Sequence, residues 1–489
     1  MNGMGALVPV PGSSAPPRRS EFGGAPPQVL GPPPQNSRSY RRLVDAASLA
    51  AFRIGFGLLL LVLVLRFFIH GWIPEYFAVP EHFFRYWGFG WVRPWPAPFM
   101  HVHFAAMGLC ALGIALGYRY RFSVIGFGVL FTYAHLVDKT NYLNHYYLVV
   151  CVCGLLALLP LHGMWSLDAR RDARIRREQL PVWMLWVLRA QFGLVYLFGG
   201  IAKLKADWLF DAQPLSIWLA RHGDIPLLGP LLIEPVTAHL MSWAGALFDL
   251  AVVPLLLFRK TRPFAYVAVV AFHALTARLF QLGMFPYLMV FGSLLYLAPS
   301  FPRALLAKLR RRPHVAPPTP SAPLLIPRWL VPLLGTYFVL QLLLPLRHVL
   351  YPGDVCWTEQ GYRFAWNVML MEKNGSVDFR IVEPRSGRSF RASPLDYFTR
   401  YQTKMMAAQP DMLLEAAHVL AADFRARGVV EPAVYVDAFA SLNGRPMQRL
   451  IDPQVDLARE VDSLRHKPWI LPMQNPRESR VTMLNRSSK

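Results

Sequence analysis

Long apolar runs occupy most of this sequence, and polar loops that carry many of its basic residues separate them. A helix needs about 17 to 25 predominantly apolar residues to cross the hydrocarbon core of a membrane. Windows of this kind predict about nine membrane-spanning helices, some of them short or broken by polar groups. They lie near 46–69, 99–117, 122–137, 143–161, 182–203, 237–258, 263–280, 283–299 and 328–346. With 54% hydrophobic residues, the chain is too apolar for an ordinary soluble enzyme.

Clusters of basic residues follow the second, fourth, sixth and eighth apolar runs, so they share one side if the runs alternate in direction. The clusters lie at 119–121, 170–177, 259–262 and 303–312. Loops rich in Lys and Arg stay in the cytoplasm, and Arg41 and Arg42 before the first run place the N-terminus there as well. The chain after 347 is therefore predicted to lie outside. The same clusters explain the net charge of +22 without a nucleic-acid partner, which would require a basic stripe.

Composition divides the chain into three predicted parts. Residues 1–40 are rich in Pro and Gly and are predicted to be disordered. Residues 41–347 form the membrane domain. Residues 348–489 contain alternating stretches such as SVDFRIVEPRSGRSFRAS, a helical pattern over 395–428 and the turn signal Asn443-Gly444. We therefore expect an α-helical polytopic membrane protein with a small α+β extracytoplasmic C-terminal domain.

The segment 189–208 is an apolar run that ends on two lysines, Lys203 and Lys205. Such lysines commonly extend to the membrane surface and mark the end of a helix, which is the simpler interpretation. Helical spacing of three and four residues, however, places a tyrosine, two glycines and a lysine on one face. These residues are Tyr196, Gly199, Gly200 and Lys203. Glycines let another helix or a flat ligand approach the backbone, so this face is a candidate binding surface.

Two further groups of polar residues interrupt the apolar sequence. Asn144 and His145 end a polar run that could be an ordinary loop, although the imidazole could also bind a phenolic or carboxylate oxygen. His273, in the seventh run, could be a packing residue bonded to a neighbouring helix. Arg278 needs an anion, either Asp249 of the sixth run in a structural ion pair or the carboxylate of a ligand.

The sequence carries no metal-ligand spacing and no soluble-enzyme motif. Phosphate-binding glycine loops, HExxH and nucleophile elbows do not occur. The four cysteines give no disulfide framework, since three of them lie in predicted helices. From the residues alone, the sequence indicates a membrane protein with an outer-facing polar pocket that contains Lys203, His145 and Arg278.

Five segments resemble the vitamin K-dependent γ-glutamyl carboxylase family in both order and spacing. The segments are DKTNYLNHYYL (138–148), QFGLVYLFGGIAKLKADWL (191–209), FHALTARLFQLGMFPY (272–287), YRFAWNVMLM (362–371) and MQRLIDPQVD (447–456). Together with the Ala-, Arg- and Pro-rich composition, they are similar to the short bacterial-type members, which carry the horizontally transferred transmembrane domain.

The resemblance implies an enzyme, a peptidyl-glutamate 4-carboxylase that acts on Glu side chains of a peptide or protein substrate. Vitamin K hydroquinone would be the co-substrate and would become the epoxide, with O2 and CO2 as substrates. The γ-C–H of Glu is too weak an acid for any side chain, so the cofactor must supply the base. The resemblance also implies a multi-pass protein surrounded by lipid in a bacterial inner membrane, without a metal and without nucleic acid.

The resemblance assigns roles to single residues. Lys203 would be the catalytic base toward the hydroquinone, and the catalytic residues Asn144 and His145 would orient or stabilise the oxygenated cofactor. The cofactor-binding residues would be His273, Tyr196, Gly199 and Gly200. The substrate-binding residues would be Arg278, Tyr362 and Trp366. Phe364 stands where the family has a tyrosine, and Tyr362 could take its place.

Two alternatives stay open from the sequence. The first is a membrane oxidoreductase that epoxidises a quinone with little or no carboxylation. The second is a non-enzymatic membrane transporter or scaffold, which would leave Lys203 without a role.

Overall fold

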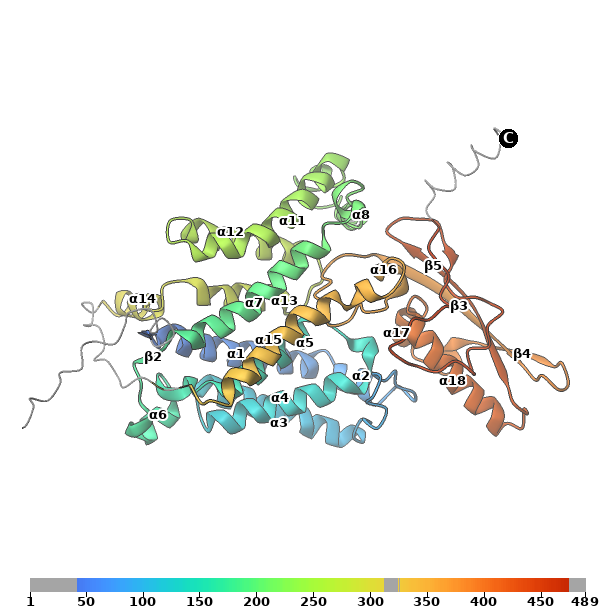
Figure 1. Cartoon of the computed structure of the whole chain (residues 1–489), viewed down its shortest axis with the longest axis horizontal. Coiled ribbons are helices and arrows are strands. Elements are labelled where there is room, and N and C mark those ends of the chain that lie inside the picture. The colour runs from blue at the N-terminus through green and yellow to red at the C-terminus, as the bar shows by residue number, and fades with distance from the viewer. Residues whose placement is uncertain (1–41, 312–323, 325, 475–489) are drawn as a thin grey trace, which may run out of the picture. The chain divides into compact units, whose positions relative to one another are not determined.

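Each of the nine predicted runs coincides with a helix in the computed structural model, which describes residues 42–311, 324 and 326–474 (Figure 1). The predicted disorder of residues 1–40 lies outside the described residues. The helices are α1 (Ala47–Ile69), α3 (Ala97–Leu116), α4 (Tyr120–Val137), α5 (Asn144–Leu158), α7 (Val182–Ala202), α11 (Pro235–Leu257), α12 (Arg262–Leu279), α13 (Phe285–Ser293) and α15 (Leu330–Leu346).

Fewer than nine of these helices are long and apolar enough to cross a membrane. Six of the described helices pass that test, and a seventh span results if α13 and α14 (Phe301–Leu309), which are bent by 100°, are taken together. The predicted count of nine is therefore not confirmed. Two of the helices are too short, because α5 has 15 residues and α13 has 9. A third, α12, has 18 residues but carries Arg262, His273 and Arg278 and is not among the six. α5 and α13 are apolar because neighbouring helices bury them, which composition alone cannot distinguish from a membrane span.

The helices pack as antiparallel neighbours along the chain. α1 packs against α3, α3 against α4, α7 against α11 and α11 against α12. Two short strands, β1 (Leu43–Asp45) and β2 (Gln179–Pro181), pair antiparallel and join the starts of α1 and α7. Arg53 of α1 is fully buried and donates hydrogen bonds to the carbonyls of Ile114 and Ala115, which satisfies the C-terminal end of α3.

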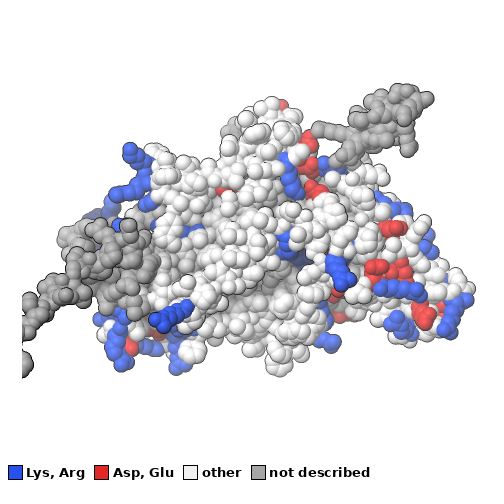
Figure 2. All heavy atoms as spheres, viewed as in Figure 1, with Lys and Arg blue, Asp and Glu red and all other residues white. Residues whose placement is uncertain are grey.

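Charge is distributed over the surface as expected for a membrane protein. Figure 2 shows a central surface that is largely free of charged side chains, and most Lys and Arg side chains lie at its margins. Part of that basic region is formed by α6 (Leu167–Arg171) and the loop after it, where Arg170, Arg171 and Arg174 are exposed. Large apolar side chains such as Phe122 and Leu109 are exposed on α4 and α3, where lipid would cover them.

The segment between α7 and α11 contains three short helices. These are α8 (Ala206–Leu209), α9 (Leu215–Ala220) and α10 (Gly229–Leu232). Trp208 of α8 donates its indole N–H to the carbonyl of Ser242 at 2.7 Å, which fixes the segment against α11. Another short helix, α2 (Trp72–Phe77), follows α1 and packs against it and against α3.

The C-terminal part is α+β, as predicted. Its sheet has the order β4-β3-β5-β6 and is antiparallel throughout, with β3 (Lys373–Val382), β4 (Ser389–Ala392), β5 (Ala433–Leu442) and β6 (Gln448–Arg449). β3 and β5 pair over their whole length, from Lys373 opposite Leu442 to Val382 opposite Ala433. Helices α17 (Arg400–Met406) and α18 (Pro410–Ala426) connect β4 to β5, and α18 packs on the sheet.

Candidate functional site

Lys203 lies at the end of α7 in a buried ion pair. Its side chain does not extend to the surface, because the residue is only 5% exposed. The ammonium nitrogen lies 2.8 Å from Asp249 Oδ2 and 3.1 Å from the carbonyl oxygen of Gly199. Asp249 comes from α11, which packs along α7. The suggested partnership of Asp249 with Arg278 is therefore wrong, and Arg278 itself is exposed at the end of α12.

A small cavity of about 60 Å³ adjoins this ion pair. Tyr196 and His273 line it together with Lys203 and Asp249. The Tyr196 hydroxyl lies 2.9 Å from His273 Nε2 and 3.2 Å from the hydroxyl of Ser293. His273 Nδ1 is buried and has no hydrogen-bond partner among the described residues, so the imidazole keeps one unsatisfied polar atom beside the cavity.

The two glycines of α7 face different neighbours. A Cβ on Gly199 would lie 3.5 Å from Asp249 Oδ2 and 4.0 Å from Lys203 Nζ, so this glycine lines the site. A Cβ on Gly200 would lie 2.7 Å from Leu250 Cδ2 and 3.1 Å from its backbone nitrogen. Gly200 therefore serves the close packing of α7 against α11 and does not line the cavity, in contrast to the single face that the spacing predicted.

A second cavity, of about 970 Å³, adjoins the first. Five residues line both cavities: Phe280, Leu282, Phe285, Val368 and Met369. Asn144, His145 and Tyr362 line the larger cavity, whereas Lys203, Tyr196 and His273 line the smaller one. The structure thus places these six predicted residues in two adjoining cavities with a shared wall.

Asn144 connects α5 to the loop that precedes β3. Its side-chain amide donates to the carbonyl of Asn367 at 2.9 Å, and its side-chain oxygen accepts from the Tyr142 hydroxyl at 2.9 Å. Tyr142 in turn accepts the backbone N–H of Phe364 at 2.6 Å. Asn144 therefore positions the cavity wall through these bonds. His145, the next residue, is buried in the same wall.

The loop 362–371 holds the remaining predicted residues in a strained backbone. Phe364, Trp366 and Met369 have φ values of 62°, 56° and 58°, a region that residues with a side chain rarely adopt. Tyr362 lines the larger cavity and donates its hydroxyl to the carbonyl of Asn367 at 3.3 Å. Trp366 is fully buried and stacks on Tyr147, and it lines neither cavity.

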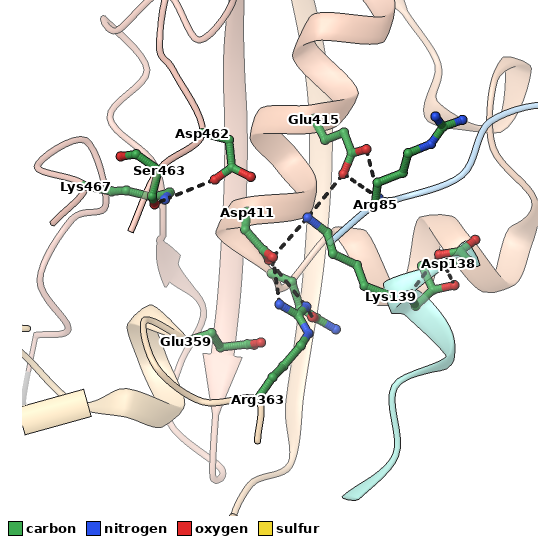
Figure 3. A network of polar contacts seen from close by, with 12 residues as sticks. Arg85, Asp138, Lys139, Glu359, Arg363, Asp411, Glu415, Asp462, Ser463 and Lys467 are labelled. Atoms are coloured by element: carbon green, nitrogen blue, oxygen red, sulfur yellow. Dashed lines mark hydrogen bonds and ion pairs between the residues drawn. The ribbon is translucent and has the colours of Figure 1, made fainter. Parts of the chain in front are cut away.

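A cluster of charged side chains joins the α4–α5 loop to the C-terminal part (Figure 3). Lys139 Nζ lies 3.1 Å from Asp411 Oδ2 and 3.2 Å from Glu415 Oε2, both on α18. Arg363 lies 2.7 Å from the same Asp411 oxygen. Burial alone would raise the pKa of Asp411, but Arg363 and Lys139 hold the pKa of that carboxyl well below its usual range.

Sequence reasoning missed this cluster, although Lys139 and Arg363 stand inside two of the resembling segments and both line the larger cavity. Their carboxylate partners lie far along the chain, and spacing within one helix gives no signal for such pairs. Lys205, which the sequence placed at a membrane surface, lies 3.3 Å from Asp354 Oδ2. The described residues contain no group of three His, Cys, Asp or Glu side chains that could hold a metal ion.

A bundle of apolar helices with a buried lysine–aspartate pair beside two adjoining cavities, joined to an α+β part, defines an integral membrane protein with internal cavities. Residues 40–301 match the family model described as the HTTM domain. Residues 326–476 match the lumenal domain of vitamin K-dependent gamma-carboxylase. The chain belongs to the vitamin K-dependent gamma-carboxylase family, as the resembling segments predicted. No solved structure matches it.

Proposed function

We propose that the protein carboxylates Glu side chains of a peptide or protein substrate and couples this reaction to the oxygenation of vitamin K hydroquinone to its epoxide. The observation that carries the proposal is the buried pair of Lys203 and Asp249 beside an apolar cavity, in a chain of the carboxylase family. O2 and CO2 are the other substrates. The protein acts in a bacterial inner membrane, with the N-terminus in the cytoplasm and the C-terminal part outside.

The cavities suit reduced vitamin K in size and chemistry. A volume of about 970 Å³ is within the range of small-molecule sites, and Leu59, Val62 and Leu63 of α1 give it an apolar wall. His273 Nδ1, which is buried without a partner, leaves a polar atom for a ligand oxygen in the adjoining small cavity. Reduced vitamin K, bound together with oxygen, supplies a base stronger than any side chain.

Lys203 and Asp249 can take one proton from a bound hydroxyl. The pair holds the same number of protons whether Lys203 is an ammonium beside a carboxylate or an amine beside a carboxylic acid. One additional proton converts either form to an ammonium beside a carboxylic acid. Because the two groups share a hydrogen bond of 2.8 Å, a proton received on either side stays within the pair. The family resemblance offered Lys203 alone as the base, and we add its ion-pair partner Asp249 to the proposed base.

The neighbouring residues hold the reacting groups and exclude water. Tyr196 and His273 fix each other through their 2.9 Å contact, and both are buried. His145, which is buried in the adjoining wall, has no carboxylate partner in the part of the chain that the structure describes. It is therefore available to a bound oxygen atom, the role that the family resemblance assigns to it.

The test uses purified full-length protein in detergent with vitamin K hydroquinone, oxygen, labelled bicarbonate and a Glu-containing peptide. Epoxide and fixed label are followed together in wild type, Lys203→Ala and Lys205→Ala. We expect both products in wild type and in Lys205→Ala, which removes a neighbouring lysine that lines neither cavity. Both should be lost in Lys203→Ala.

Other outcomes would contradict the proposal. Normal activity of Lys203→Ala would overturn the assignment of the base. Epoxide without fixed label in wild type would indicate a quinone-epoxidising oxidoreductase. If wild type forms neither product, the chain is a non-enzymatic membrane protein.

A further inference from the structure

Arg66 stands out among the charged residues of the larger cavity because no carboxylate in the described part of the chain neutralises it. Three cationic side chains line this cavity: Arg66, Lys139 and Arg363. Lys139 pairs with Asp411 and Glu415, and Arg363 pairs with Asp411. The acidic lining residue, Glu359, pairs with Lys373 at 2.9 Å. Among the described residues, Arg66 therefore has no acidic partner within ion-pair distance, and its positive charge remains available to the cavity.

Arg66 lies at the end of an apolar helix beside an aromatic ring. It lies in the last turn of α1, an apolar helix that passes the test for a membrane span, and it is partly buried. Its guanidinium group lies over the ring of Trp72 at 5.2 Å, which orients the group but does not neutralise it. A partly buried guanidinium that no carboxylate of the described residues neutralises is suited to receive an anion.

Arg66 and His145 converge on one point of the cavity wall. An ideal Cβ built on Gly283 would lie 3.6 Å from both Cε1 and Nε2 of His145, and 4.0 Å from Nη1 of Arg66. Gly283 has φ +58°, so the backbone here takes a conformation that favours glycine and leaves the space between the two side chains free. A guanidinium and an imidazole that both approach one point of the cavity wall form a site for a small oxyanion.

We infer that Arg66 binds the side-chain carboxylate of the Glu substrate, an inference that rests on the proposed function. Removal of the γ-proton breaks a C–H bond, passes the proton to the base, and leaves the electron pair on a carbon next to the carboxylate. The negative charge then spreads onto the carboxylate oxygens until the carbon forms its bond to CO2. A planar guanidinium that donates two hydrogen bonds to this group stabilises that charge and holds the γ carbon in place.

Arg66 thus takes the role for which the sequence offered Arg278. Arg278 is exposed and lines neither cavity, whereas Arg66 lines the larger one next to His145. No sequence pattern predicts this role, since Arg66 is simply a basic residue at the end of an apolar run.

The test measures binding without turnover. Purified full-length protein in detergent, without hydroquinone, is titrated by calorimetry with a short peptide that contains one Glu and with the same peptide carrying Gln. Wild type is compared with Arg66→Gln, Arg66→Lys and the exposed control Arg93→Gln. We expect wild type and Arg93→Gln to prefer the Glu peptide. Arg66→Gln should lose at least tenfold in affinity for the Glu peptide, with little change for the Gln peptide, and Arg66→Lys should recover part of the loss.

Several results would overturn the inference. They are an unchanged Glu preference in Arg66→Gln, an equal loss for both peptides, and no preference in wild type. An equal loss of affinity for both peptides would indicate that Arg66 has a structural role. An unchanged preference for the Glu peptide would indicate that Arg66 binds another anion, such as a lipid phosphate.

The outcome separates this inference from the proposed function. Selective loss of Glu binding in Arg66→Gln, in a protein that makes neither product, would keep the carboxylate site and reject the reaction. Full turnover with an unchanged KM for the Glu peptide in Arg66→Gln would keep the reaction and reject the role of Arg66.

Discussion

Lys203 Nζ and Asp249 Oδ2 lie 2.8 Å apart between α7 and α11, and their side chains are only 7% and 11% exposed. Removing one member of such a pair leaves the other charge buried without compensation. Removing both can be nearly neutral, since two apolar side chains can fill the same space. Stability and activity are therefore expected to respond differently to single and double substitutions at this pair.

Asp249→Asn should lower the free energy of unfolding by about 3 kcal/mol or more and abolish epoxide formation, since Lys203 loses its partner in an apolar setting. The double variant Lys203→Met with Asp249→Leu should recover most of the stability and none of the activity. Thermal unfolding in detergent, together with epoxide formation, measures both effects. An Asp249→Asn variant with wild-type activity would show that Lys203 needs no carboxylate.

Substitution by alanine should affect stability at only one of the two neighbouring glycines of α7. Gly200→Ala pushes a methyl group against Leu250, including its backbone nitrogen at 3.1 Å, so α7 and α11 must separate and the unfolding temperature should fall. Gly199→Ala makes only ordinary contacts with the ion pair, so its stability should stay close to wild type while hydroquinone turnover changes. Equal unfolding temperatures for the two variants would contradict this division.

The sequence predicted the helices well because an apolar run is a local property. It failed on their number because α5 and α13 are apolar through burial and too short to span, and because α12 carries Arg262, His273 and Arg278 and is not apolar enough. The alternating pattern of β5 was sufficient to predict a strand, since the side chains of a strand alternate between two faces.

The candidate site was only partly predictable. Tyr196 and Lys203 share one helix face, so their spacing placed them together. Asp249 was noticed and given the wrong partner, and Arg66 was missed. These errors have one cause, because helical spacing orients a residue within its own helix and says nothing about which other helix faces it.

The buried Asp138 predicts a pH-dependent stability. Burial raises the pKa of Asp138 to about 6. The hydrogen bonds that its carboxylate accepts from Thr140 and Gln402 lower the pKa, but burial has the larger effect. A folded-state pKa above the usual 3.8 means that the folded protein binds this proton more tightly than the unfolded chain. Stability from this group should therefore increase by about 3 kcal/mol as the pH falls from above 6 to below 4.

Asp138→Asn removes this titration, so the difference in unfolding temperature between wild type and variant should shift in favour of wild type between pH 7 and pH 5. The exposed Asp224→Asn serves as the control and should follow wild type at every pH. A difference that does not change with pH would show that Asp138 is already protonated, or already ionised, across the whole range.

The charged cluster in Figure 3 should control how firmly α18 holds the loop before α5. Lys139, with a side chain 3% exposed, contacts both Asp411 and Glu415, so Lys139→Met leaves two carboxylates with fewer partners. We expect a loss of about 3 kcal/mol in the free energy of unfolding. Lys139→Arg keeps the charge and should recover part of it.

Hydrogen exchange locates this effect. Amides of α18 and of the loop 138–143 should exchange faster in Lys139→Met than in wild type, whereas the paired strands β3 and β5 should change little. The exposed Lys404→Ala, on α17, is the matched control and should leave exchange unchanged. Because Lys139 and Arg363 also line the larger cavity, a faster-exchanging α18 should be accompanied by weaker binding of the Glu peptide. Unchanged exchange in Lys139→Met would show that apolar packing, and not this cluster, holds the two parts together.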